Sequence, residues 1–280
     1  MWVLRVLIAL LFAALVILVD LPLHFITWLI ERNNPGACTK FRHDYARAAM
    51  KGIWFLAGGD ETVIGLEKVP TDRPVLFVGN HRSIFDILLA GSLITYPVGF
   101  VAKKELEHTP IKIIMEEIHC LFLDREDPRQ GLKTILTAIE YVKQGVSMFI
   151  FPEGTRCKVE GTFLPFHAGS FKIATKAKVP VVPVTIVNTG DLFEDHYPRL
   201  KKVPVVIEFG DPIETADMDR NAQKELPDKV KAIMEETYKK NAKLIGLDTP
   251  PAQAEQSPAK ESPAKESPAE ESPAEEKTAE

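Results

Sequence analysis

Short apolar runs alternate with amphipathic stretches along the middle of this 280-residue chain. Runs rich in valine, isoleucine and phenylalanine are typical of buried strands. They predict strands at 75–78, 98–102, 120–123, 147–151, 181–187 and 205–209. Apolar residues elsewhere recur every three or four positions, as they do from Leu132 to Val142, which indicates helices with one buried face. The helices predicted in this way cover residues 84–93, 110–117, 129–143, 170–178 and 222–244.

This alternation predicts an α/β fold with a mixed, mainly parallel sheet flanked by helices on both faces. In open sheets of this kind, ligands bind beyond the carboxyl ends of the strands. Polar residues that directly follow a predicted strand are therefore the first candidates for a functional site.

The N-terminal end is a long apolar segment. From Trp2 to Val19, Arg5 is the one charged residue, and the apolar pattern resumes after Asp20 and Pro22. Eighteen helical residues extend about 27 Å, close to the ~30 Å core of a bilayer. A cleaved signal peptide is disfavoured, because the apolar core is too long and no small-x-small site follows it. A single span and a helix pair in one leaflet both fit, with a buried core helix as the alternative. Pro22 favours a break, with a second, shallower helix over 21–30.

Basic residues are more frequent after this segment than before it; they are Arg32, Lys40, Arg42, Arg47 and Lys51. By the positive-inside rule the body of the protein lies on the cytoplasmic side. We therefore expect a membrane-associated protein whose active site faces the cytoplasm, on the plasma membrane if the source is bacterial.

Residues 248–280 have a different composition. They repeat Ser-Pro-Ala every five residues and contain nine acidic residues and three lysines. So few apolar side chains cannot offset the entropy of ordering, which predicts a disordered tail, with a spacer or docking arm as the alternative. Without the tail, the net charge of −5 becomes slightly positive, which gives no indication of nucleic-acid binding. The predicted organisation is a membrane-associated helical segment (1–31), a catalytic domain (32–247) and the tail.

Candidate chemistry begins after the predicted strand at 75–78, where His81 and Asp86 stand five residues apart. A carboxylate that orients a histidine makes a general base able to deprotonate an alcohol. On one continuous helix the two would point about 140° apart. They can pair if His81 lies in the turn before a helix and Asp86 in its first turn. The alternative is structural: Ser83 suits an N-cap, and Asp86 would then only close a capping box.

Charged residues follow three other predicted strands in the same way. They are Asp124-Arg125, the run Pro152-Glu153-Gly154-Thr155-Arg156, and Lys103-Lys104. Arginine suits bidentate phosphate binding, glycine allows close backbone approach, and threonine can donate a hydrogen bond to a phosphate oxygen. Each charge could instead be a solvated loop residue or part of an ion pair. The three cysteines and the scattered histidines show no metal-ligand spacing, so no metal or other cofactor is expected.

These motifs resemble those of the 1-acylglycerol-3-phosphate acyltransferase family of glycerolipid acyltransferases. The resemblance covers roughly residues 50–215 and rests on four motifs in order: His81-x4-Asp86, Leu121-Phe122-Leu123-Asp124-Arg125, Phe151 to Arg156, and the Val-Pro-x-x-Pro-Val run from Val179 to Val184. Cys157 stands where a serine is common in the family. The apolar fourth motif reads either as a buried strand or as the wall of an apolar substrate channel.

The resemblance implies a glycerol-3-phosphate acyltransferase-like fold and a direct acyl transfer from acyl-CoA or acyl carrier protein to the sn-2 hydroxyl of 1-acylglycerol-3-phosphate, which forms phosphatidic acid. It also leaves room for the same chemistry on glycerol 3-phosphate, another lysophospholipid or a lyso-aminolipid. His81 would be the base and Asp86 its support. The acceptor phosphate would be bound by Arg125, Glu153, Gly154, Thr155 and Arg156, assisted by Lys103 and Lys104. Partners would be the lipid acceptor, the acyl donor and the membrane surface.

Overall fold

The computed structural model describes residues 2–124 and 127–247. The predicted disordered tail and the candidate residue Arg125 lie outside the described residues. Among the described residues, seven strands form one sheet in the order β1-β7-β6-β2-β5-β3-β4. Their bounds are β1 Asp60–Ile64, β2 Leu76–Gly79, β3 Val98–Lys103, β4 Leu121–Leu123, β5 Ser147–Ile150, β6 Val181–Val187 and β7 Pro204–Phe209.

Neighbouring strands run parallel except β6 and β7, which are antiparallel. The predicted mixed, mainly parallel sheet is therefore confirmed, and each predicted strand lies within about one residue of its expected bounds. Because β2, β5, β3 and β4 are parallel neighbours, their carboxyl ends meet at one edge of the sheet. The residues that follow these four strands are brought together there.

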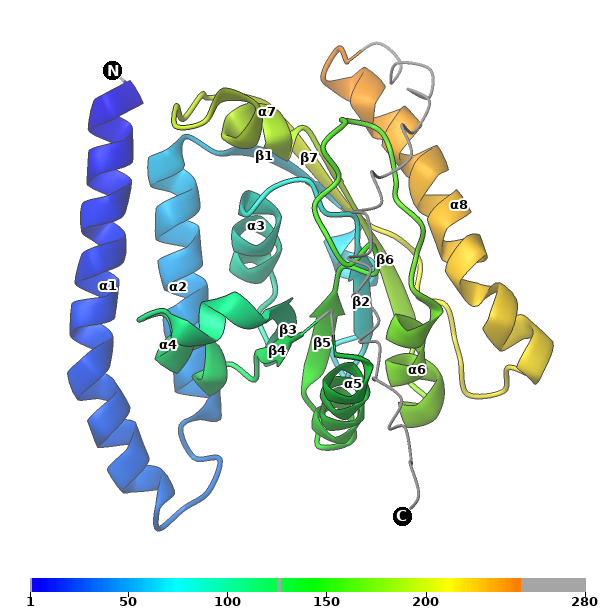
Figure 1. Ribbon diagram of the computed structural model, residues 1–280, viewed down its shortest axis with the longest axis horizontal. Helices are drawn as coiled ribbons and strands as arrows, with labels where there is room; N and C mark the ends of the chain where they lie inside the picture. The colour runs from blue at the N-terminus through cyan, green and yellow to red at the C-terminus, as the bar shows by residue number, and fades with distance from the viewer. Residues whose placement is uncertain (1, 125–126, 248–280) are drawn as a thin grey trace, which may run out of the picture. The chain divides into compact units, whose positions relative to one another are not determined.

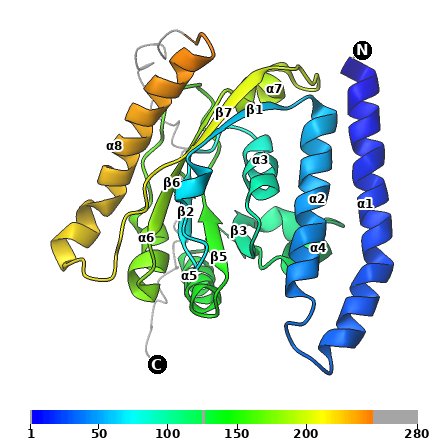
Figure 2. The same cartoon turned by 180° about the vertical axis from the view of Figure 1, so that it is seen from behind.

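Helices cover both faces of the sheet (Figure 1). Their bounds are α1 Trp2–Glu31, α2 Thr39–Ala57, α3 Phe85–Leu93, α4 Lys112–Glu117, α5 Pro128–Lys143, α6 Ala168–Ala177, α7 Thr189–Leu192 and α8 Arg220–Leu244, with short 3-10 turns η1 Leu66–Lys68, η2 Lys104–His108 and η3 Glu194–His196. Helices α2 and α3 pack on one face, and α5, α6 and α8 pack on the other, as the view from behind also shows (Figure 2).

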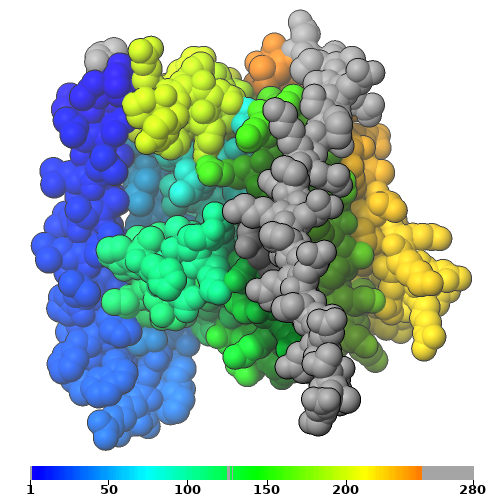
Figure 3. Space-filling model, in the orientation of Figure 1, coloured from blue at the N-terminus to red at the C-terminus, as the bar shows by residue number. Residues whose placement is uncertain are grey.

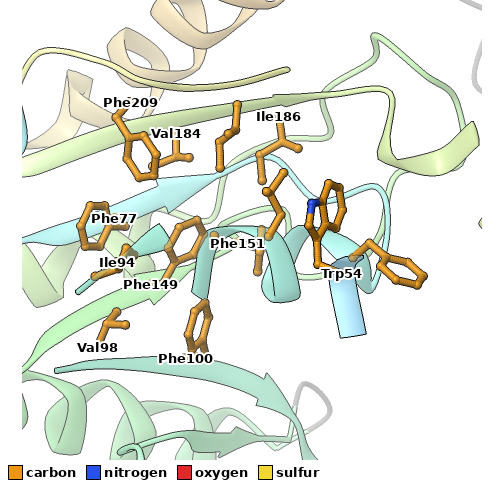
Figure 4. Packing of buried hydrophobic residues seen from close by; sticks show 14 of the residues in the cluster. Trp54, Phe77, Ile94, Val98, Phe100, Phe149, Phe151, Val184, Ile186 and Phe209 are labelled. Atoms are coloured by element: carbon orange, nitrogen blue, oxygen red, sulfur yellow. The ribbon is translucent and has the colours of Figure 1, made fainter. Parts of the chain in front are cut away.

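The two cores follow from the two-residue period of the strands. On β2, Phe77 points into the core under α2 and α3, while Leu76 and Val78 point into the core under α5, α6 and α8. Phe77 stacks on Phe149 with ring centroids 5.7 Å apart, and Figure 4 shows these two rings at the centre of the first core. Burying each such side chain contributes about 1.5–3 kcal/mol. Strands buried on both faces therefore read as continuous apolar runs.

Helix α1 is a single helix that continues through Pro22. The predicted break is therefore wrong. Contacts on both sides of the proline hold the helix in place: the Tyr45 hydroxyl of α2 donates to the Val16 carbonyl at 2.7 Å, and His24 Nδ1 lies 2.6 Å from a carboxylate oxygen of Glu117 on α4. Tertiary contacts thus stabilise a helix from which proline removes one backbone hydrogen bond.

The outer face of α1 carries exposed leucines, isoleucines and valines. By length and composition α1 could cross a membrane, and none of its most apolar window is buried in the protein. This excludes the buried core helix that the sequence left open. In the space-filling view α1 forms one flank of the molecule (Figure 3).

Candidate active site

The turn between β2 and α3 carries the His/Asp pair. Asn80 fixes the start of this turn, because its side-chain amide donates to the Ile186 carbonyl and accepts from the Ile186 N–H, both at 2.8 Å. His81 lies in the turn and Asp86 in the first turn of α3. Nδ1 of His81 is 2.9 Å from Oδ2 of Asp86. The two residues meet in the geometry that their spacing requires.

Asp86 is fully buried and saturated with donors. Its Oδ2 accepts from the backbone N–H groups of Arg82 at 2.7 Å and Ser83 at 2.8 Å, as well as from His81. Its Oδ1 accepts from the hydroxyl of Thr189, at the start of α7. Asp86 therefore accepts hydrogen bonds from the backbone at the start of α3 and also contacts the imidazole, so the capping contact and the His81 contact are both present.

The imidazole of His81 is held on its face as well. Its ring stacks on Phe151, just after β5, with centroids 4.1 Å apart. Since a carboxylate only accepts hydrogen bonds, the proton shared with Asp86 belongs on Nδ1. Nε2 then carries a lone pair, as a general base requires.

The backbone of His81 is clamped by the loop after β5. Its N–H donates to Oε1 of Glu153 at 3.0 Å, and its carbonyl accepts from the Cys157 N–H at 2.7 Å. The other oxygen of Glu153 accepts from the Leu164 N–H at 2.9 Å. Glu153 is 4% exposed, and burial raises its pKa to about 7, partly offset by these two backbone donors. The carboxylate thus joins two loops.

Arg156 extends beside the N-terminus of α3. Its Nη1 donates to Oε1 of Glu194 at 2.9 Å, and the same oxygen accepts from the Ile84 N–H at 2.8 Å. A carboxylate therefore lies where a guanidinium and a helix N-terminal N–H converge, which is an arrangement suited to any oxyanion. Behind it, the buried Arg82 forms ion pairs with Asp195 and Glu160.

A cavity of about 1100 Å³ opens at His81. Its polar lining includes Lys103, Asp124 and the run from Glu153 to Arg156. Its apolar walls come from β3, η2, β4 and α5; they include Val101, Leu106, Leu123, Leu132, Ile135 and Ile139. Gly154 has a φ of +70°, and a Cβ there would meet the His167 ring at 3.1 Å, so this turn requires glycine. The cavity offers a base, cations and an apolar volume together.

Comparison with known proteins agrees with this geometry. Residues 61–187 match the family model described as Acyltransferase. A 1-acyl-sn-glycerol-3-phosphate acyltransferase of Saccharomyces cerevisiae is 30% identical over 197 residues, which are 69% of this chain and 65% of the yeast protein. A probable 1-acyl-sn-glycerol-3-phosphate acyltransferase of Mycoplasma genitalium is 34% identical over 168 residues, 58% of this chain and 61% of that protein. The chain is therefore similar to 1-acyl-sn-glycerol-3-phosphate acyltransferases over its middle part.

The fold comparison extends further along the chain. The crystal structure of the 1-acyl-sn-glycerophosphate acyltransferase of Thermotoga maritima matches with a TM-score of 0.71 at 25% identity, covering 86% of this chain and 95% of that one. The chain spans slightly less than two thirds of the yeast and Mycoplasma relatives.

Most of the predicted site residues line this cavity; they are His81, Lys103, Glu153, Gly154, Thr155 and Arg156. Asp86 lies behind His81. Lys104 does not line the cavity and instead donates to Asp124 at 2.8 Å. The apolar run 179–184 leads into and begins β6, a strand that is buried along its whole length, so it is core rather than channel wall.

Three contributors were missed by the sequence reasoning: Thr189, Phe151 as the stacking partner of His81, and Glu194. Phe151 had a signal, since it belongs to the run after β5. Thr189 and Glu194 had none, because they follow β6 and lie 103 residues from Asp86 and 110 residues from Ile84, with which they form hydrogen bonds. In the described part of the chain, no cluster of three or more His, Cys, Asp or Glu side chains is arranged to hold a metal ion.

Proposed function

We propose that this protein transfers a fatty acyl group from an acyl thioester, acyl-CoA or acyl carrier protein, to the sn-2 hydroxyl of 1-acylglycerol-3-phosphate. The observation that carries this proposal is the His81–Asp86 pair beside a large cavity that is lined by apolar side chains and by several cationic ones. A lysophospholipid acceptor needs a base for its hydroxyl, cations for its phosphate and apolar walls for its chain. Similarity to 1-acyl-sn-glycerol-3-phosphate acyltransferases supports the same reaction.

In this mechanism Nε2 of His81 takes the proton of the acceptor hydroxyl, and Asp86 stabilises the imidazolium that forms. The acceptor oxygen bonds to the thioester carbonyl carbon, and the carbon–sulfur bond then breaks. The proton on Nε2 passes to the leaving thiolate, which restores the neutral imidazole. No acyl-enzyme is formed. Cys157 is buried, and burial raises its thiol pKa, which disfavours a nucleophilic thiolate.

The acceptor phosphate would bind beside Arg156, with Thr155, the Gly154 backbone and Lys103 around it. Arg125 and Lys104 stay predicted contributors from the second motif and from η2. For Glu153 the contacts favour a positioning role, because both of its oxygens are committed to backbone N–H groups. A carboxylate would also repel a phosphate. We therefore propose that Glu153 holds the His81 turn against the phosphate-binding loop.

Both substrates are amphiphilic, so the reaction belongs at a membrane surface. The exposed apolar face of α1 would attach the protein there. The basic residues that follow α1 favour the cytoplasmic face. The donor and acceptor would then enter the cavity without leaving the interface.

The test is a transfer assay with the purified full chain in mixed micelles. Labelled oleoyl-CoA, palmitoyl-CoA and acyl carrier protein are each offered with 1-acylglycerol-3-phosphate, glycerol 3-phosphate, other lysophospholipids and a lyso-aminolipid. We expect phosphatidic acid as the main product, and no product from a folded His81→Ala variant. Preference for another acceptor would replace the proposed substrate, and substantial turnover by His81→Ala would refute the general-base mechanism.

A further inference from the structure

The first turn of α6 forms part of the cavity wall at a place that none of the four motifs covers. Ala168, Gly169 and Ser170 all line the cavity. The N-cap residue, His167, makes no side-chain capping hydrogen bond, so the N–H groups of Ala168 and Gly169 have no intrahelical acceptor. A Cβ built on Gly169 would meet nothing within 4 Å, so the cavity reaches the backbone here.

Ser170 gives an independent indication of a ligand. The residue is 8% exposed, and it lines the cavity. Its backbone N–H donates to the His167 carbonyl, whereas its hydroxyl has no hydrogen-bond partner among the residues that the structure describes. The residue as a whole is largely buried, but its hydroxyl oxygen is accessible from the cavity. Its hydrogen-bonding capacity is available to a group within the cavity.

The charges along α6 differ from those at the motif end. Arg156 and Lys103 line the cavity but each is paired with a carboxylate, Glu194 and Glu105 respectively. Lys172 and Lys176 lie one and two turns along α6, also line the cavity, and form no ion pair with any described residue. The positive end of the helix, a hydroxyl and two cations without carboxylate partners thus face one volume, and all of them favour an anion.

The geometry points to a second phosphate-binding subsite at the first turn of α6, formed by the N–H groups of Ala168 and Gly169, the Ser170 hydroxyl and Lys172. This inference rests on the proposed acyl transfer, in which both substrates carry phosphate. The acceptor phosphate is assigned to the Arg156 end of the cavity. The phosphate bound at α6 is therefore that of the pantetheine carrier of the acyl donor, with Lys176 placed for a further phosphate.

One position allows a test that separates binding from folding. An aspartate at position 169 would place a negative charge at a helix N-terminus, which stabilises the helix, in open space. The same charge would repel a phosphate. We expect Gly169→Asp to weaken coenzyme A binding at least tenfold while Tm is unchanged or higher. Gly169→Asn introduces a side chain of nearly the same shape without the charge. This variant should lose much less of its affinity for coenzyme A.

The measurement is calorimetric titration of the full chain in detergent with two soluble probes, coenzyme A and glycerol 3-phosphate. Lys172→Glu should also weaken coenzyme A binding about tenfold and raise the donor KM with little change in acceptor KM. Lys133→Glu, an exposed lysine of α5 that does not line the cavity, is the matched control and should change neither.

Loss of coenzyme A binding alone supports the donor subsite. Loss of glycerol 3-phosphate binding alone, or no change with either probe, overturns it. These titrations need no turnover, so they are read separately from the transfer assay. If the wild type transfers acyl groups and Gly169→Asp binds coenzyme A normally, this inference fails while the proposed function stands. If the wild type transfers nothing, the proposed function fails.

Discussion

The carboxylate of Asp86 accepts four hydrogen bonds, and only one of them comes from the histidine it supports. Three donors lie within five residues of it, but the fourth, Thr189, comes from the segment after β6. That contact fixes the second carboxylate oxygen, and with it the rotation of the group that faces His81. A buried oxygen that loses its donor costs about 1–3 kcal/mol, so this hydroxyl is a positioning element for the pair.

We predict that Thr189→Val lowers kcat about tenfold with little change in either KM, because the substrates do not touch this residue. The acid limb of the kcat/KM pH profile should also move, since Asp86 would support the imidazolium less well. Thr189→Ser, which keeps the hydroxyl, should restore most of the rate. Steady-state kinetics across pH measures all three effects.

Thr175→Val is the matched control, because the Thr175 hydroxyl is buried without a hydrogen-bond partner in the described part of the chain. It should leave kcat unchanged. Equal losses of kcat from Thr175→Val and Thr189→Val would mean that the Thr189 hydroxyl has no specific positioning role and contributes only to packing.

Glu153 makes the free energy of unfolding depend on pH. Its folded pKa of about 7 lies above the usual value of about 4.3 in an unfolded chain. Between these values the folded state binds more protons than the unfolded state, so this group makes the free energy of unfolding fall as pH rises. The whole effect amounts to at most about 4 kcal/mol.

We predict that Glu153→Gln removes this dependence. Urea unfolding of both proteins at pH 5 and pH 8 gives four free energies of unfolding. The free energy of unfolding of the wild type minus that of the variant should decrease between pH 5 and pH 8. A constant difference would show that Glu153 does not titrate in this range. The variant should also turn over more slowly, because a glutamine amide nitrogen cannot accept one of the two backbone N–H groups.

Sequence reasoning found the residues of this site that share a motif, and it missed those joined only by the fold. Residue type and position directly after a predicted strand were enough to identify His81, Asp86 and the run from Glu153 to Arg156. Thr189 is one of many threonines in the chain, and nothing local marks it. The role of Glu153 also depended on the structure, since a carboxylate beside an arginine reads as a ligand contact until both of its oxygens are found on backbone N–H groups.

At the scale of elements, periodicity predicted strands well because the central sheet is buried on both faces. It missed β1, whose residues are mostly exposed at the sheet edge, and α2, whose buried positions include His43 and three small or aromatic residues rather than a regular apolar face. The break predicted at Pro22 failed for another reason. Contacts of α1 with α2 and α4 outweigh the helix-breaking tendency of Pro22, and such tertiary contacts cannot be seen in the local sequence.

The polar residues that interrupt α1 are explained by these contacts. Arg42 of α2 donates to the Thr27 hydroxyl at 2.7 Å and pairs with Glu31 at 2.9 Å. Arg42 is largely buried, so removing its charge leaves Glu31 without a cation partner among the described residues and leaves Glu117 with the His24 contact alone. The carboxyl half of α1 is therefore attached to the body by a polar cluster, while its outer face stays apolar.

We predict that Arg42→Gln loosens α1, lowers Tm by several degrees and speeds proteolysis in the segment between α1 and α2. Lys40→Gln is the control on the same helix, because Lys40 and its partner Asp44 form an exposed pair worth less than about 1 kcal/mol. Thermal unfolding and limited trypsinolysis compare the two. Similar Tm values for both variants would mean that apolar packing alone holds α1.

For the whole molecule, the structure separates what folds the protein from what would attach it to a membrane. Two cores on either side of the sheet stabilise the body without contributions from the outer face of α1. That face exposes side chains such as Leu11 at 72% and Leu18 at 65%. Seven residues apart, these two leucines lie on the same side of the helix. They can be changed with little effect on the fold.

We predict that the double variant Leu11→Glu/Leu18→Glu keeps its Tm within about two degrees of the wild type but partitions into phospholipid vesicles more than tenfold less. The reason is that charged side chains in apolar lipid cost about 2.5–3.5 kcal/mol each. Vesicle flotation measures the partitioning. Turnover of a long-chain lysophospholipid presented in vesicles should fall in parallel, whereas turnover of a short-chain, water-soluble acceptor should not, since the cavity is untouched. Full vesicle binding by the double variant would instead require another surface of the molecule to hold the membrane.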